Sequence, residues 1–125
     1  MMKREIKTPL SPQPVASYSQ GIKVGNTVYV AGQGPLDVQT GNVPEGAAAQ
    51  TRQVLTNIQN ILEAGGAKMK DVMKVTAHLQ DLADFEEYNK VYQEFFSAPY
   101  PVRTTVQSGL ANILVEIDVI AEIEG

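Results

Sequence analysis

The most informative residue for chemistry is Arg103, which follows the two prolines of the stretch 97–106. Proline fixes its own backbone φ angle, and the β-branched run from Thr104 predicts a strand, so Arg103 is expected where a loop becomes a strand. A guanidinium offers a planar fork of N–H donors, which fits a carboxylate better than a lysine ammonium does. The stretch therefore indicates either a carboxylate-binding site or an ordinary solvated or salt-bridged arginine.

Glu116 is a second candidate, because it lies in the most regular pattern of the sequence, residues 113–123. Apolar residues alternate there with acidic and mixed ones, which predicts a strand with one face in the core. The other face suits a wet subunit interface or the wall of a pocket. If a strand at 104–108 pairs with this one, Arg103 and Glu116 approach each other, as a site or as a plain ion pair.

Asn89 and Gly32 are weaker candidates. Asn89 lies at the edge of an aromatic stripe on a predicted helix, and a partly buried amide needs hydrogen-bond partners, which a neighbouring loop or a ligand would supply. Gly32 and Gly34 end a predicted strand, where they allow either a tight exit from the sheet or the close approach of a ligand. The pattern is not a phosphate-binding loop, since no Lys-Ser/Thr pair follows it.

Several classes of chemistry are disfavoured by composition. The chain has no cysteine, which removes disulfides and thiolate chemistry, and its single histidine, His78, makes zinc catalysis and a Ser-His pair poor candidates. We interpret His78 as structural, on the polar face of a predicted strand. A net charge of −4 with dispersed basic residues argues against a nucleic-acid-binding surface.

The length of 125 residues predicts one domain, residues 1–125, and a polar N-terminus without a long apolar run predicts a cytoplasmic protein. Periodicity predicts an α+β fold with two helices covering one face of the sheet, and the uncovered face favours oligomerisation. The expected strands are residues 4–7, 18–24, 27–31, 72–80, 104–108 and 113–123, and the expected helices are 47–64 and 84–97.

Finer expectations follow from the same patterns. In the first helix, Gln50 and Asn57 should face solvent. The second helix should start with a capping box from Asp84 to Glu87 and bury Phe85 with the other aromatic residues. Met73 should point to the core from the strand 72–80.

A set of motifs occurs in order between about residue 14 and residue 123. They include Tyr18-Ser-Gln-Gly, Val30-Ala-Gly-Gln-Gly-Pro35, Gln50-Thr-Arg-Gln-Val-Leu-Thr-Asn57-Ile, Leu62-Glu-Ala-Gly-Gly66, Asn89-x-Val-Tyr92-x-x-Phe-Phe96, Pro101-x-Arg-Thr-Thr105-Val and Val115-Glu-Ile-Asp-Val-Ile-Ala121. In these motifs the sequence resembles the Rid family, also called the YjgF or L-PSP endoribonuclease-like family. Ala31 departs from it where many members have serine, and Ala16-Ser17 replaces the usual Gly-Pro before Tyr18.

The resemblance implies a chorismate-mutase-like fold of the bacillary type, a six-stranded mixed sheet with two helices on one face, assembled as a homotrimer with clefts between subunits. It also implies hydrolytic deamination of reactive 2-enamine and 2-imine intermediates, such as 2-aminoacrylate or 2-iminopropionate from PLP enzymes, to 2-keto acids and ammonia. No metal or organic cofactor is implied.

The resemblance also assigns roles to individual residues. Arg103 would hold the substrate carboxylate and Glu116 would orient or activate water. The cleft would also be lined by Tyr18, Gly32, Asn89 and Thr105. Two other functions stay open: an endoribonuclease or translation inhibitor, which the acidic composition disfavours, and a non-catalytic sensor that binds 2-keto acids.

Overall fold

The computed structural model describes residues 2–124. Its strands and helices form at the segments that the hydrophobic periodicity of the sequence predicts. Six strands form one mixed sheet in the order β1-β2-β3-β6-β4-β5. The elements are β1 (Arg4–Ile6), β2 (Gly21–Val24), β3 (Thr27–Gln33), α1 (Ala47–Ala64), β4 (Val72–Leu79), α2 (Phe85–Phe95), β5 (Val102–Gln107) and β6 (Val115–Glu122), with 3-10 turns at η1 (Met69–Asp71) and η2 (Leu82–Asp84). No helix within residues 2–124 is long and apolar enough to cross a membrane.

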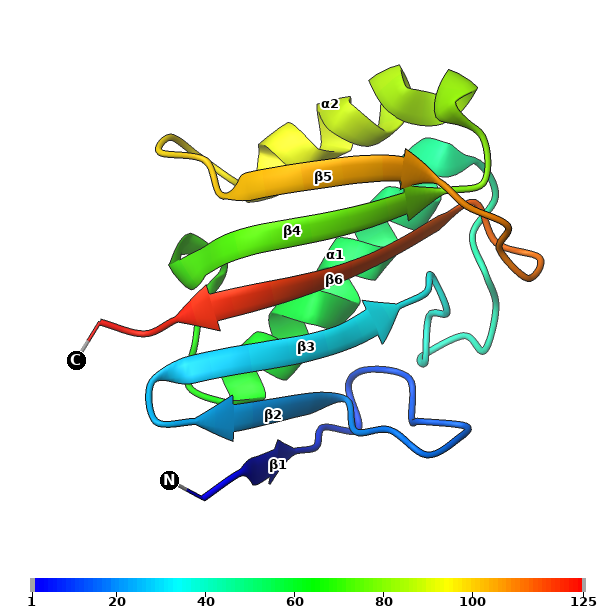
Figure 1. Cartoon of the computed structure of the whole chain (residues 1–125). Helices are drawn as coiled ribbons and strands as arrows, with labels where there is room; N and C mark the ends of the chain where they lie inside the picture. The colour runs from blue at the N-terminus through cyan, green and yellow to red at the C-terminus, as the bar shows by residue number, and fades with distance from the viewer. Residues whose placement is uncertain (1, 125) are drawn as a thin grey trace.

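Both helices pack on the same face of the sheet, as predicted (Figure 1). The core between the layers contains the inward residues of β6, which are Val115, Ile117, Val119 and Ala121, together with the apolar stripe of α1. The opposite face of the sheet has no helix over it and exposes Tyr29 on β3 and Val106 on β5. An uncovered face with exposed apolar side chains is typical of a subunit interface.

Strand β5 pairs with β4, and β6 lies on the other side of β4, so the pairing of the strand at 104–108 with the last strand, which the sequence left as one possibility, does not occur. The β4–β5 pair is parallel, and α2 makes the crossover between them (Figure 1). Parallel neighbours require such a connection because a tight turn cannot return the chain to the same end of the sheet. The crossover places α2 beside β5, where it contributes to the candidate site.

Two polar residues of α1 are buried rather than exposed to solvent, which corrects the expectation for this helix. The Gln50 side chain accepts a hydrogen bond from the Leu114 N–H at 2.7 Å and donates one to the Pro44 carbonyl at 3.0 Å. The Asn57 amide donates to the carbonyls of Gly34 and Leu36, each at 3.0 Å. These amides hold two connecting segments, β3–α1 and β5–β6, against α1 because each satisfies backbone groups that the strands leave unpaired.

Element ends also differ from the sequence-based expectation. Strand β2 begins at Gly21, so Tyr18 lies in the preceding loop, and β5 begins one residue before Arg103. Met73 is 52% exposed because the β4–β6 register shifts between Val72 and Lys74, which breaks the alternation there.

The start of α2 differs as well. The predicted capping box at Asp84 is wrong, because Asp84 makes no side-chain cap hydrogen bond. Instead, the Asp81 carboxylate accepts a hydrogen bond from the Ala83 N–H and caps the preceding turn η2. Phe85, expected in the buried stripe, is 36% exposed.

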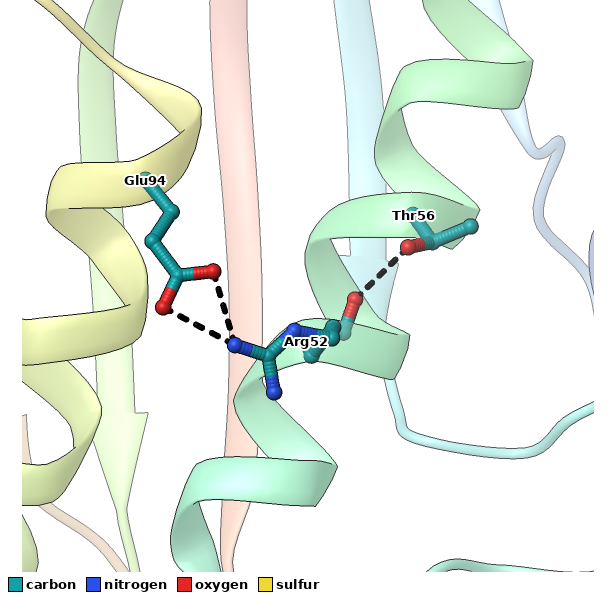
Figure 2. Close-up of polar contacts among 3 residues, drawn as sticks. All are labelled: Arg52, Thr56 and Glu94. Atoms are coloured by element: carbon teal, nitrogen blue, oxygen red, sulfur yellow. Dashed lines mark hydrogen bonds and ion pairs between the residues drawn. The ribbon is translucent and has the colours of Figure 1, made fainter.

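Arg52 on α1 and Glu94 on α2 join the two helices on their solvent side, as Figure 2 shows. One guanidinium nitrogen of Arg52 lies 2.7 and 2.9 Å from the two carboxylate oxygens of Glu94, and the Thr56 hydroxyl donates to the Arg52 carbonyl at 2.8 Å. Such an exposed pair contributes about 0–1 kcal/mol, so the position of α2 depends mainly on its buried aromatic face.

Candidate functional site

Arg103 points from β5 toward α2 and is held there from two directions. Its Nη1 donates a hydrogen bond to the Asn89 side-chain oxygen at 2.8 Å. Its guanidinium carbon lies 4.5 Å from the centre of the Tyr92 ring, 5.4 Å from that of Tyr88 and 5.5 Å from that of Phe85. These three rings are here called the aromatic cage. Rings at these distances attract a cation through their quadrupoles, so the cage holds the arginine without neutralising it.

Within residues 2–124, no carboxylate lies within 4.0 Å of the Arg103 guanidinium. By contrast, one guanidinium nitrogen of Arg52 forms an ion pair with Glu94. An arginine that has a neutral amide and aromatic rings as its partners keeps a full positive charge for an external anion. The alternative that Arg103 forms an ordinary salt bridge is therefore wrong within the subunit.

A surface pocket of about 300 Å³ opens beside Arg103. Its lining residues are Asn89, Tyr92, Gln93, Tyr100, Pro101 and Arg103. Arg103 is the one charged residue among them, and the other polar groups are amides and phenols. The pocket thus fits a small molecule that has a single carboxylate and an uncharged remainder.

The two tyrosines of the aromatic cage stay uncharged near neutral pH. Burial raises the pKa of Tyr92 to about 12, against the opposing effect of the Arg103 charge. Burial also raises the pKa of Tyr88, whose hydroxyl lies 3.0 Å from the Thr105 hydroxyl. Thr105 therefore supports the cage through its side chain. The Tyr92 hydroxyl is buried and has no hydrogen-bond partner.

Glu116 and Gly32 meet on the uncovered side of the sheet. Glu116 alternates with the buried Val115 and Ile117 on β6, and it pairs across strands with His78 on β4. A Cβ atom on Gly32 would lie 2.8 Å from Glu116 Oε2, closer than real Cβ contacts. The absence of a side chain at Gly32 therefore leaves the space that the Glu116 carboxylate occupies.

Arg103 and Glu116 do not approach each other within one subunit. Arg103 faces α2, whereas Glu116 faces the uncovered side, and β4 separates their strands. Their approach was expected only if β5 paired with β6, and that condition is not met in the single chain. The candidate residues therefore fall into two groups on opposite faces of the sheet.

Comparison with known proteins identifies the relatives of this chain. Residues 8–123 match the family model described as Endoribonuclease L-PSP. The chain belongs to this family, the Rid family. A 2-iminobutanoate/2-iminopropanoate deaminase of Dermatophagoides farinae is 45% identical over 98% of both chains. A RutC family protein of Pyrococcus abyssi is 44% identical over 97% of this chain and 98% of its own.

A solved structure agrees with the Rid-family fold. RidA from the Antarctic bacterium Psychrobacter sp. PAMC 21119 superposes with a TM-score of 0.91 at 43% identity, over 96% of this chain and 99% of its own. The six-stranded mixed sheet with two helices is thus the architecture of solved Rid proteins.

Tyr18, the remaining candidate from the Rid resemblance, lies toward the uncovered side of the sheet, where it shares a pocket with the exposed Tyr29. It is 46% exposed in the loop before β2 and lines a pocket of about 430 Å³ together with Ala31, the residue before Gly32. The subunit therefore presents Arg103, Asn89 and Thr105 near α2, and Glu116, Gly32 and Tyr18 elsewhere.

His78 lies on the uncovered face, where it has a polar side chain as a neighbour. Its Nδ1 lies 2.8 Å from the Ser108 hydroxyl. On the same face, burial raises the pKa of Asp118, while the charges of His78 and Lys74 act in the opposite direction. The Ser108 contact gives His78 a hydrogen-bond partner, which agrees with a structural role.

Sequence reasoning missed the function of the aromatic cage. Tyr88 and Tyr92 were expected only as core residues of the second helix. The available signal was their spacing: Phe85, Tyr88, Asn89 and Tyr92 recur at three- and four-residue intervals, so they share the helix face that carries the Asn89 amide.

Proposed function

We propose that this Rid-family protein hydrolyses reactive 2-imino acids to 2-keto acids and ammonia. The observation that carries this proposal is the unpaired charge of Arg103 in a pocket without acidic residues, which suits the carboxylate of a 2-imino acid. The deaminase name of a relative at 45% identity supports the reaction class.

The proposed reaction requires the protein mainly to position the substrate carboxylate and a water molecule. A 2-enamine first tautomerises to the 2-imine by taking a proton at C3 and losing one from its nitrogen. Water then adds to the electrophilic C2, and the resulting carbinolamine breaks its C–N bond, so that one imine and one water give one keto acid and one ammonia. Arg103 fixes the carboxylate, and Glu116 orients the water at C2. Holding two small reactants in this arrangement supplies much of the rate enhancement.

We further propose that the active cleft lies between copies in a homotrimer. Arg103 and Glu116 lie on opposite faces of one sheet, so one subunit cannot direct both at a single small substrate. A neighbouring copy brings the two groups together when its uncovered sheet face, with Glu116, Gly32 and Tyr18, meets the Arg103 edge. A closed ring of three such heterologous contacts completes every cleft.

The direct test couples an amino-acid oxidase to the protein and follows imine loss by semicarbazone formation. Wild type and Arg52→Ala should both accelerate the loss of 2-iminopropionate, because Arg52 forms a surface ion pair with Glu94 and lies outside the Arg103 pocket. Arg103→Ala should reduce the acceleration at least about 100-fold, because it removes a charge-assisted hydrogen-bond pair. Equal rates for wild type and Arg103→Ala would overturn the proposal, and inactivity of wild type with tight 2-ketobutyrate binding would favour the sensor.

A further inference from the structure

We propose that Tyr92 is a positioning residue whose ring holds the Arg103 guanidinium in the orientation that binds the ligand carboxylate. This inference rests on the proposed function of Arg103 and adds a residue that acts through it. Tyr92 is 4% exposed, and its ring is the nearest of the aromatic cage to the guanidinium.

Two constraints together define the orientation of the guanidinium. The hydrogen bond from Nη1 to Asn89 acts within the guanidinium plane, where the N–H donors lie. The contact with the Tyr92 ring, at 4.5 Å from its centre, restricts movement of the guanidinium toward the helix. Because a bidentate carboxylate bond depends on the direction of the fork, loss of either constraint should weaken ligand binding.

The ring of Tyr92, and not its hydroxyl, carries this role. The hydroxyl is buried and makes no hydrogen bond to any of residues 2–124. Phenylalanine keeps the aromatic face and removes only the unpartnered hydroxyl, so Tyr92→Phe should preserve the orientation of Arg103. Leucine keeps an apolar side chain but has no quadrupole, so Tyr92→Leu should release the guanidinium.

Phe96 offers a matched control for the loss of a buried ring. Its ring centre lies 4.5 Å from that of Tyr92, and its side chain is 6% exposed, but it is not part of the aromatic cage. Phe96→Leu therefore reports the cost of removing a core aromatic at the C-terminal end of α2 without removing the Tyr92 ring beside Arg103.

The first readout is the split between KM and kcat for 2-iminopropionate. Tyr92→Leu should raise KM about 10-fold with kcat changed by less than about 3-fold, because a desolvated cation–π contact has about that strength. Tyr92→Phe and Phe96→Leu should keep the wild-type KM. A wild-type KM in Tyr92→Leu, or an equal rise in Phe96→Leu, would overturn the inference.

The second readout does not depend on activity. The chain has three arginines, Arg4, Arg52 and Arg103, so an NMR spectrum of arginine Nε–H groups is simple to assign with Arg103→Lys. The Arg103 signal should be shifted by ring current in wild type, Tyr92→Phe and Phe96→Leu. In Tyr92→Leu it should move toward the position of an exposed arginine, because the nearest of the three rings is lost while Tyr88 and Phe85 remain at 5.4 and 5.5 Å. An unmoved signal in Tyr92→Leu would contradict the role of Tyr92 even if the protein is a deaminase. A moved signal in a protein that lacks deaminase activity would support the role of Tyr92 and refute only the deaminase proposal.

Discussion

Gly32 and Glu116 lie so close together that a Cβ atom on the glycine would approach Glu116 Oε2 to 2.8 Å. The glutamate carboxylate therefore occupies space that any other residue at position 32 would take. The atom that must yield is the end of a flexible side chain, so the fold tolerates the change while the carboxylate moves.

Gly32→Ala should therefore reduce activity without reducing stability to a similar extent. We expect kcat for imine hydrolysis to fall at least about 10-fold, because displacement of a water-positioning group by a few tenths of an ångström spoils its alignment. The melting temperature should change little. Gly109→Ala is the control, because a Cβ atom there meets nothing within 4 Å. A fully active Gly32→Ala variant would show that the position of Glu116 is unimportant.

Substitutions at Asn89 should show whether Arg103 needs a neutral rather than a charged hydrogen-bond partner. Asn89→Ala removes the acceptor 2.8 Å from Nη1 and should raise KM about 3- to 10-fold, as expected for one hydrogen bond to a charged group. Asn89→Asp places a carboxylate beside the guanidinium, where it competes with the substrate, so its KM should exceed that of Asn89→Ala while its melting temperature does not fall. Steady-state kinetics with a wild-type KM in Asn89→Asp would contradict the requirement for a free arginine charge.

Tyr92 should contribute to alkaline denaturation. The pKa of Tyr92 is raised to about 12 in the folded protein, above the value of about 10 for an unfolded tyrosine. The folded state thus favours the neutral phenol, and the stabilising contribution is complete below pH 10 and is lost as the pH rises from about 10 toward 12. Urea denaturation across this range should show a smaller fall in the free energy of unfolding for Tyr92→Phe. Parallel curves for the two proteins would rule out this titration.

Much of the fold could be predicted from local pattern. The alternation from Val115 to Ala121 and the apolar stripe of α1 reflect strand and helix geometry directly, so the elements and the single covered face were expected correctly. Strand pairing was not predictable in this way, because the pattern of β5 is the same whether its neighbour is β4 or β6. The conditional contact between Arg103 and Glu116 within one subunit is therefore absent, because β4 lies between their strands.

The buried polar groups show a second limit of pattern reading. Asn57 looks like a surface residue because its partners are carbonyls of Gly34 and Leu36, more than twenty positions away in the chain. The aromatic cage was hidden for the same reason: Tyr92 was placed correctly on its helix, but its contact with Arg103 depends on β5 lying beside α2.

The central claim is that one cleft combines Arg103 from one copy with Glu116 from another, and complementation tests it most directly. Arg103→Ala and Glu116→Gln are each expected to be inactive as purified proteins. Chains with different tags would be coexpressed and oligomers carrying both tags isolated. Every trimer that carries both variants has one cleft of its three with both native residues, so imine hydrolysis in the isolated mixed oligomers should return to about one third of the wild-type rate. Mixed oligomers that stay as inactive as either parent would contradict a shared cleft.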